Sequence, residues 1–504
     1  MPTKVWTAAL NGLDAVIVTV EADAGGGDFG RIAIVGLPDA ALSEARERVK
    51  SALRNCGLEF PRRKITVNLA PAGLKKRGSA YDLPIAISIL ALKNKFSVDL
   101  SDCLLVGELS LWGEVRPVSG ILSISLAAKA AGIKNLFVPR SNSAEASLVK
   151  ELKIFPLDTL SGLIDYLRGK QISTPAPGYD ETASQTHCSI DMASIRGQEK
   201  AKRALEISAA GGHNLLLYGP PGSGKTLLAK ALPDILPPIS FDEKIEITKI
   251  YSLAGKLGKD GALISARPFR SPHHSASAAA LIGGGSWPRP GEISLAHRGV
   301  LFLDEFPEFP RPVLENLRQP LEEGEISINR AADCLRFPAK FILLAAMNPC
   351  PCGYAGDKSN NCSCRPGQIL AYRRRLSGPL LDRIEMHIEV PRLDFSSLTG
   401  EKMGETSDTI GKRVETARQR QLERFSGHHL VTNSEIPIPL LEKWCRLDKE
   451  SLCLLRKAND SLKLSARSCF RVIKLARTVA DLAATNNIMI EHLAEALQYR
   501  PKLE

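Results

Sequence analysis

Apolar and polar positions alternate with two different periods in the first third of the chain. A period of two predicts strands at residues 15–20, 32–35 and 65–69. Apolar positions at helical spacing predict helices at residues 40–55, 83–92 and 122–131. Because strands and helices mix here, we expect residues 1–170 to form an α/β or α+β domain of their own.

The remaining pattern predicts a linker and two further domains. Residues 171–190 combine prolines, a glycine and mixed polar residues, which is typical of a linker. Residues 191–393 contain apolar runs that predict buried strands at 215–218, 299–303 and 341–346. Residues 394–504 predict a small helical domain, with helices at 409–425, 440–447, 451–461, 467–484 and 491–498.

A glycine-rich turn follows the strand predicted at 215–218. Its eight residues fit the P-loop pattern: Gly219, Pro220, Pro221, Gly222, Ser223, Gly224, Lys225 and Thr226. Glycines let successive backbone N–H groups point inward, and with the next helix N-terminus they form a cradle for an anion. Lys225 would reach the β- and γ-phosphates of ATP, and the Thr226 hydroxyl would ligate Mg²⁺. A purely structural glycine-rich turn is the alternative.

Polar residues also end the next two predicted strands of this domain. Asp304 and Glu305 follow the strand at 299–303, and Asn348 follows the strand at 341–346. An acid at a strand end beside a P-loop can reach the metal, so we expect Asp304 to hold Mg²⁺ through water. Glu305 would polarise the water that attacks the γ-phosphate, and Asn348 would orient that water. A helix cap is the alternative for the two acids.

Together these motifs resemble an AAA+ ATPase. Residues 268–274 and 289–299 resemble magnesium-chelatase ATPase subunits and, more closely, the ComM/YifB group of Mg-chelatase-like proteins. The likeness covers essentially the whole chain. It implies an α/β multidomain protein with an AAA+ core at 191–393 and a helical lid at 394–504. It also implies a hexameric DNA motor that moves branched junctions while taken-up DNA is integrated by homologous recombination.

The resemblance also assigns roles to arginines. Arg383 matches the arginine finger, which reaches the γ-phosphate of the neighbouring subunit. Arg374, Arg375 or a salt bridge of Arg383 within its own subunit are the alternatives. Arg467 matches the sensor-2 position, where it would contact the γ-phosphate and couple hydrolysis to lid rotation. Arg471 and a surface salt bridge are the alternatives for that role.

The first domain resembles the Lon-protease-type domain of Mg-chelatase-like proteins through residues 70–84 and 107–134. A Ser–Lys peptidase needs a nucleophile and a base. Ala80 stands at the aligned nucleophile position and Leu122 at the aligned base position, and neither side chain can do that chemistry. We therefore predict a non-proteolytic domain, unless the alignment slips by one residue to Ser79.

Two features between the predicted strands indicate a polymer substrate. The stretch between the P-loop helix and Asp304 carries Arg267 and Arg270 and is too long for a normal connection. Residues 325–337 predict a β-hairpin with Arg330 near its tip. These arginines are candidates for gripping a phosphate backbone. A hairpin that only packs subunits together is the alternative.

His273 and His274 are adjacent in the same long stretch. Metal binding or catalysis is one use for such a pair. We expect instead a hydrogen-bonded pair in a subunit interface.

Four cysteines cluster directly after Asn348: Cys350, Cys352, Cys362 and Cys364. Four thiols in a loop of this kind suit tetrahedral Zn²⁺, and they leave no open position for water, so the metal would be structural. It would fix the strand that carries Asn348 or shape a face of the pore. Free thiols and a redox switch are the alternatives.

Composition and net charge indicate the class of partner and the compartment. A chain of 504 residues is too long to fold around a single hydrophobic core, so two to four domains are expected. Lysine and arginine total 66 against 55 acids, and the net charge of +11 favours polyanionic partners. No apolar run approaches the ~20 residues of a membrane span, and no signal peptide is evident. The eleven cysteines form no small disulfide framework, so we expect a cytoplasmic protein.

The function predicted is an ATPase that translocates DNA, with DNA, five further copies of the chain and recombination proteins as partners. The alternative is a chelatase-like motor that remodels a protein partner, whose ATPase would respond to protein and ignore DNA. An ATP-dependent peptidase is disfavoured by Ala80 and Leu122.

Overall fold

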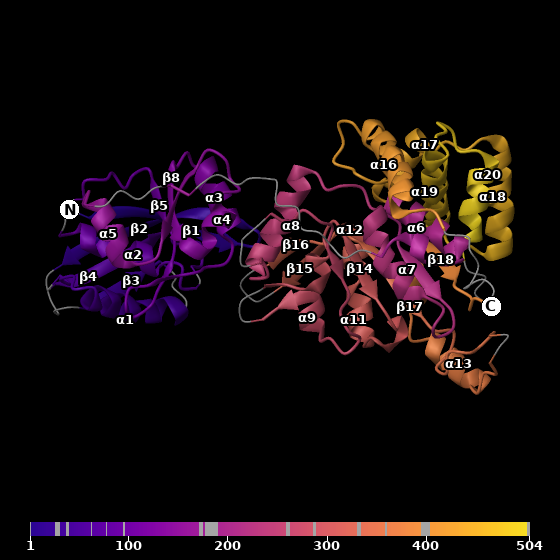
Figure 1. Ribbon diagram of the computed structural model, residues 1–504, viewed down its shortest axis with the longest axis horizontal. Coiled ribbons are helices and arrows are strands. Elements are labelled where there is room, and N and C mark those ends of the chain that lie inside the picture. The colour runs from indigo at the N-terminus through magenta and orange to yellow at the C-terminus, as the bar shows by residue number, and fades with distance from the viewer. Residues whose placement is uncertain are drawn as a thin grey trace. The chain divides into compact units, whose positions relative to one another are not determined.

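The computed structural model describes residues 2–25, 31–36, 40–61, 63–76, 78–93, 96–170, 175–176, 190–258, 263–285, 289–329, 334–357, 360–394 and 404–500. The chain divides into two compact units (Figure 1). The first comprises Met1–Ser184 with Lys244–Ile264, and the second comprises Gln185–Glu243 with Ser265–Glu504. The predicted linker lies almost entirely outside the described residues, so its extent stays a prediction.

A seven-stranded mixed sheet forms the centre of the first unit, in the order β3-β4-β2-β1-β5-β8-β9. Its strands are β1 (Thr3–Asn11), β2 (Asp14–Gly25), β3 (Ile32–Val35), β4 (Lys64–Ala70), β5 (Cys103–Leu105), β8 (Asn135–Pro139) and β9 (Lys153–Leu157). The pairs β1–β2 and β2–β4 are antiparallel, and the other neighbours are parallel. Alternate residues of β2, including Val18 and Val20, are buried.

Helices and a small hairpin complete the first unit. The helices are α1 (Ala40–Asn55), α2 (Asp82–Ala91), α3 (Ile121–Ala130), α4 (Ser143–Ala146) and α5 (Leu160–Leu167), and the hairpin joins β6 (Glu108–Leu109) to β7 (Val115–Arg116). Helix α2 is buried along nearly its whole length, which fits its apolar sequence. The mixed sheet and these helices confirm the predicted α/β character.

Part of the long insertion after the P-loop belongs to the first unit. Helix α8 (Phe241–Leu253) begins in the second unit, and from Lys244 onward the chain packs with the first. The Ser252 hydroxyl accepts the Gly120 backbone N–H at 2.9 Å and donates to the buried Glu145 carboxylate. Leu263 joins a small apolar cluster with Leu122. The position where a Lon-type base would stand is thus filled by apolar packing.

A five-stranded parallel sheet forms the centre of the second unit, in the order β11-β14-β17-β10-β18. The strands are β10 (Leu215–Tyr218), β11 (Phe269–Arg270), β14 (Val300–Leu303), β17 (Ile342–Met347) and β18 (Met386–Glu389). All neighbours run parallel, from Phe269↔Val300 at one edge to Leu215↔Met386 at the other. Every residue of β14 and β17 is buried, as expected for a sheet covered on both faces.

The two faces of this sheet bury separate cores. Leu215 and Leu217 face a cluster that includes α6 (Glu199–Gly211) and α7 (Lys225–Ala231), whereas Leu216 faces the other cluster. That second cluster takes residues from α9 (Ala278–Ile282), α10 (Glu292–Leu295), α11 (Arg311–Asn316), α13 (Pro366–Arg373) and α14 (Gly378–Leu381). Helix α12 (Arg318–Glu323) leads from α11 into a hairpin.

Five longer helices follow the sheet, close to the predicted ranges. They are α16 (Ser407–Arg424), α17 (Ile438–Trp444), α18 (Lys449–Leu462), α19 (Ala466–Leu482) and α20 (Ile490–Gln498). Three of them begin at residue types that favour helix N-caps, with Thr406, Asp448 and Ser465 accepting a backbone N–H. Their apolar residues share one core with α6 and α7, so a lid that begins at residue 394 stays a prediction.

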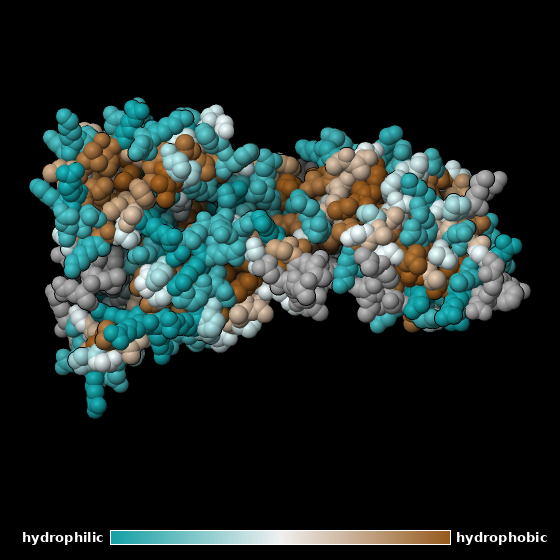
Figure 2. Space-filling model, turned by 180° about the vertical axis from the view of Figure 1, so that it is seen from behind, coloured by the Kyte–Doolittle hydropathy of each residue, from teal (hydrophilic) through white to brown (hydrophobic). Residues whose placement is uncertain are grey.

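The predicted hairpin is present in the second unit, where β15 (Glu325–Asn329) pairs antiparallel with β16 (Cys334–Pro338). Arg330 lies outside the described residues. None of the helices in the described parts of the chain has the length and hydropathy of a bilayer-spanning segment. On the face shown in Figure 2, hydrophobic residues occur in patches among hydrophilic ones.

Candidate functional site

Backbone geometry shapes the P-loop between β10 and α7. A Cβ added at Gly219 would lie 2.1 Å from the Val390 carbonyl oxygen, so only glycine fits there. Gly222 and Gly224 have φ angles of +74° and +94°, which side chains rarely tolerate. The turn therefore depends on glycine at three of its positions, and its last glycine leads directly into α7 at Lys225.

The Lys225 ammonium lies inside this turn. Its Nζ donates to the carbonyl oxygens of Gly219 at 2.8 Å and Pro220 at 2.9 Å, and to Asn348 Oδ1 at 3.2 Å. Burial lowers the pKa of Lys225, and the nearby Asp304 charge opposes that effect. An anionic phosphate is a stronger acceptor than these neutral oxygens. The structure thus brings Lys225 and Asn348 together where a phosphate group would bind.

The two predicted magnesium ligands lie side by side. Thr226 Oγ1 donates to Asp304 Oδ2 at 2.9 Å, although the residues are 78 positions apart. Both are hard oxygen donors of the kind Mg²⁺ prefers, and they leave positions for water and nucleotide oxygens. The donor set therefore fits a magnesium ion that is shared between the protein and a nucleotide.

Glu305 contacts a residue that the sequence did not connect with it. Its carboxylate Oε2 lies 2.9 Å from His274 Nδ1, and its backbone adopts a left-handed φ of +52°. His274 also contacts His273, with ring centroids 4.1 Å apart and the rings tilted by 34°. The contact links the pair to the predicted catalytic acid, and its place in a subunit interface stays a prediction. The sequence alone does not predict this contact, because it depends on the parallel pairing of β11 with β14. That pairing places the segment after β11 beside the end of β14.

The arginines predicted to contact the γ-phosphate lie near the other ends of the strands, away from the P-loop. Asn214, which directly precedes β10, donates its side-chain amide to the Arg383 carbonyl oxygen at 3.2 Å. The P-loop leaves the other end of β10, so the length of that strand, about 10 Å, separates the two. Arg383 therefore lies near the start of β10, away from the P-loop of its own chain.

Glu322 on α12 holds both of the predicted arginines. Arg383 Nη2 donates to Glu322 Oε1, and Arg467 Nη1 lies 3.2 Å from the same oxygen. The Arg383 side chain is 8% exposed, and that of Arg467 is 66% exposed. The ion pair left open for Arg383 in the sequence is thus present, and it joins Arg383 to Arg467.

The alternative arginines have other partners. Arg375 is exposed and donates to the Glu308 carboxylate at 2.5 Å, while Arg374 is exposed. Arg471 Nε lies 3.8 Å from Glu385 Oε1, and its side chain is 15% exposed. Exposed ion pairs are weak, so the Arg375 pair would not prevent other contacts.

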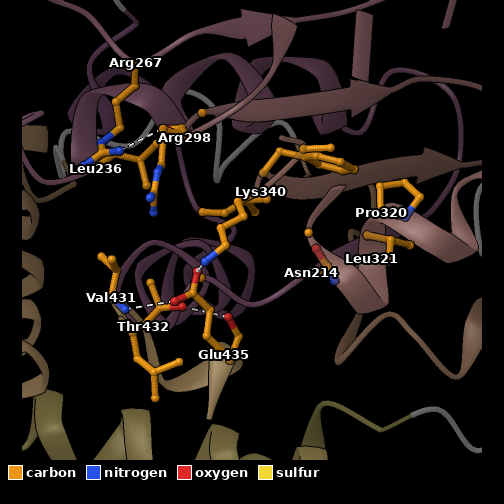
Figure 3. Close-up of a pocket in the computed structure, with 18 of the residues that line it drawn as sticks. Asn214, Leu236, Arg267, Arg298, Pro320, Leu321, Lys340, Val431, Thr432 and Glu435 are labelled. Carbon is orange, nitrogen blue, oxygen red and sulfur yellow. Dashed lines mark hydrogen bonds and ion pairs between the residues drawn. The ribbon is translucent and has the colours of Figure 1, made fainter. Parts of the chain in front are cut away.

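Two of the three arginines predicted to bind DNA are engaged within the chain. Arg267 donates to the carbonyl oxygens of Pro237 at 2.6 Å and Arg298 at 2.7 Å, and burial lowers its pKa. Arg270 donates to Glu292 at 2.6 Å. Figure 3 shows Arg267 on the wall of an internal pocket, across which Lys340 reaches Glu435. Arg267 thus has a structural role within the chain, and the DNA roles of Arg267 and Arg270 stay predictions.

The four cysteines after Asn348 converge. Their Sγ atoms all lie within 4.8 Å of one another, with separations of 3.3 Å (Cys350–Cys352), 3.5 Å (Cys352–Cys362) and 3.7 Å (Cys350–Cys362). Zinc–sulfur bonds of about 2.3 Å in a tetrahedron place the sulfurs about 3.8 Å apart. The donor set and its spacing therefore fit Zn²⁺.

Family comparisons match three segments of the chain. The family described as "Magnesium chelatase, subunit ChlI" matches residues 191–398, and "Magnesium chelatase, subunit ChlI C-terminal" matches 404–500. "Subunit ChlI of Mg-chelatase" matches residues 20–142. Both compact units are thus represented in this family.

Individual relatives extend the similarity to the full length. Competence protein ComM of Haemophilus influenzae is 44% identical over 503 residues, which cover 98% of this chain and 97% of that protein. YifB of Salmonella typhimurium is 44% identical over 500 residues, or 98% and 96% of the two chains. Lon protease 2 of Syntrophobacter fumaroxidans is 29% identical over 113 residues, 21% of this chain and 14% of that protein.

Proposed function

Because the chain belongs to the ComM/YifB group of magnesium-chelatase-like AAA+ proteins, we propose that it is an ATP-driven hexameric DNA motor. Its task is branch migration during the integration of DNA by homologous recombination in natural transformation. One observation carries the ATPase part: Lys225, Asn348, Thr226 and Asp304 meet at the P-loop edge of the sheet. The similarity to ComM, a competence protein, supports the DNA part.

Within one subunit, the P-loop edge supplies binding and general-base chemistry. Lys225 and the backbone N–H groups hold the phosphates, and Thr226 and Asp304 hold Mg²⁺. Asn348 orients a water molecule toward the γ-phosphorus. Glu305 takes the proton of that water as it attacks. A Mg²⁺ ion held there by Thr226 and Asp304 would supply charge neutralisation at the phosphates.

The second half of the site comes from a neighbouring copy. Arg383 and Arg467 lie at the edge of the sheet away from their own P-loop, so both contact the γ-phosphate held by another subunit. This differs from a lid role of Arg467 within its own chain. In each subunit Glu322 holds the two arginines together. The site is complete only between two copies.

Three- and four-strand branch migration with the purified chain tests the DNA function. A DNA motor should move a Holliday-type junction with ATP, and its ATPase should rise when DNA is added. A wild-type chain that moves no junction, and whose ATPase ignores DNA, contradicts the proposal. An ATPase that responds instead to a protein partner would indicate the chelatase-like alternative.

Arg330→Ala is expected to spare basal ATPase and to weaken DNA coupling. If Arg330 neutralises one phosphate, the slope of log K for DNA against log salt should fall by about one. Arg336→Ala is the matched control, since Arg336 lies in the same hairpin, is 69% exposed and pairs with Glu325. If wild type and Arg330→Ala have equal salt slopes, the hairpin does not bind DNA through Arg330.

His274→Ala is expected to raise basal ATP hydrolysis. His274 contacts the Glu305 carboxylate, which must accept a proton from the attacking water. A hydrogen bond contributes about 1 kcal/mol, so the increase should be about two- to fivefold. Ser275→Ala, which removes the hydroxyl partner of His273, is the control for disturbance of the loop. Steady-state phosphate release measures the effect. A fall in the rate of His274→Ala would mean that His274 positions Glu305 and does not restrain it.

A further inference from the structure

The four-cysteine loop is attached to the phosphate site through the chain itself. Asn348, whose Oδ1 accepts from Lys225 Nζ at 3.2 Å, is followed after one proline by Cys350. Cys350 is fully buried, and its sulfur accepts the Ala355 backbone N–H at 3.3 Å. The first thiol of the cluster therefore fixes the end of β17 that presents Asn348.

The loop also rests on the P-loop. Gly353 has a φ of +89°, and its N–H donates to the Cys350 carbonyl oxygen at 3.0 Å. A Cβ added at Gly353 would lie 2.6 Å from both Cδ and Cγ of Pro221. Pro221 is the third residue of the P-loop, and Gly353 is the residue after Cys352. The turn between the first two thiols and Ala355 is thus pressed against the phosphate cradle.

The described part of this loop has no regular secondary structure and few buried side chains. Of the four cysteines only Cys350 is buried, and the described residues between Cys352 and Cys364 form turns and bends without helix or strand. A bound metal would close the loop and order it, because ligand bonds replace the apolar core that such a segment lacks. The position of the Gly353 turn, and so of its contact with Pro221, then depends on the four ligands.

We propose that the zinc-bound cysteine loop is a positioning element for nucleotide binding. It holds the P-loop through Gly353 and Pro221, and the sensor residue through Cys350 and Asn348, so that ATP affinity depends on the metal. The inference rests on the proposed function only in placing a nucleotide at the P-loop. It requires no DNA activity.

Two glycines of the loop give a matched test. Gly353 and Gly356 both have positive φ, at +89° and +82°, so alanine carries a similar backbone cost at either position. Only at Gly353 would the new Cβ meet the P-loop, since nothing lies within 4 Å of a Cβ at Gly356. Gly353→Ala should weaken ATP binding at least about fivefold, the effect of modest overpacking. Gly356→Ala should remain within about twofold of wild type.

The experiment measures zinc per chain by atomic emission and ATP affinity by calorimetry on the full-length protein. We expect one zinc per chain in wild type and both variants, and weaker ATP binding in Gly353→Ala alone. Chelation of the wild-type zinc should weaken ATP binding, and added zinc should restore it. Equal ATP affinity in the two glycine variants, unchanged affinity after chelation, or a wild-type chain that binds no zinc overturns the proposal. Failure of branch migration would leave these binding results unaffected.

Discussion

Glu305→Gln is expected to bind ATP like the wild type and to hydrolyse it about 10²–10⁴-fold more slowly, the range for loss of a general base. Glutamine keeps the size of the side chain and can still hydrogen-bond to His274, but it cannot take a proton from water. The P-loop contacts of Lys225 with Asn348, and of Thr226 with Asp304, do not involve this side chain. Binding and hydrolysis should therefore separate.

Glu308→Gln is the matched control for this change. Glu308 is a partly exposed acid three residues further on and pairs with Arg375, so its loss should change hydrolysis by less than about twofold. Calorimetry with ATP and single-turnover phosphate release make the two measurements. Hydrolysis by Glu305→Gln at near the wild-type rate would show that another group accepts the proton.

Arg383→Ala is expected to lower ATP hydrolysis about 10³–10⁵-fold, as loss of an arginine finger does, without changing ATP affinity for its own P-loop. The reason is the position of Arg383 before β18, at the edge of the sheet away from the P-loop. Arg467→Ala should act in the same direction, since Arg467 shares Glu322 with it.

Arg375→Ala separates this effect from a general loss of positive charge. Arg375 is exposed and engaged with Glu308, so its removal should leave hydrolysis within about twofold of wild type. If hydrolysis falls further in Arg375→Ala than in Arg383→Ala, the finger is instead one of the exposed arginines, Arg374 or Arg375, that follow α13. Thermal unfolding of Arg383→Ala shows whether loss of its buried ion pair alone lowers stability.

Local sequence patterns predicted the parts of the site that depend on neighbouring residues. A strand, a glycine turn and a helix follow each other within a dozen residues around Gly219, so their geometry is set locally. Asp304 and Asn348 could be placed because parallel strands end at a common edge. Residue type and order were enough for these positions.

Contacts between distant residues could not be predicted in the same way. The pairing of Arg383 with Glu322 joins residues 61 positions apart, and the burial of Arg267 depends on carbonyl groups of two other segments. From the sequence alone, a charged side chain is predicted to be exposed, because its buried partners are not known. The packing of Lys244–Ile264 with the first unit could not be predicted for the same reason. No periodicity within the segment specifies the part of the chain against which it packs.

Mixing Lys225→Ala with Arg383→Ala tests most directly whether the site is shared between copies. Each variant alone should be nearly inactive, whereas a ring that contains both can place an intact P-loop against an intact Arg383. Random pairing in a closed ring predicts recovery at about a quarter of the sites. Return of ATPase to that level on mixing would agree with the account. A mixture as inactive as its components, with both variants shown to assemble together, would contradict it.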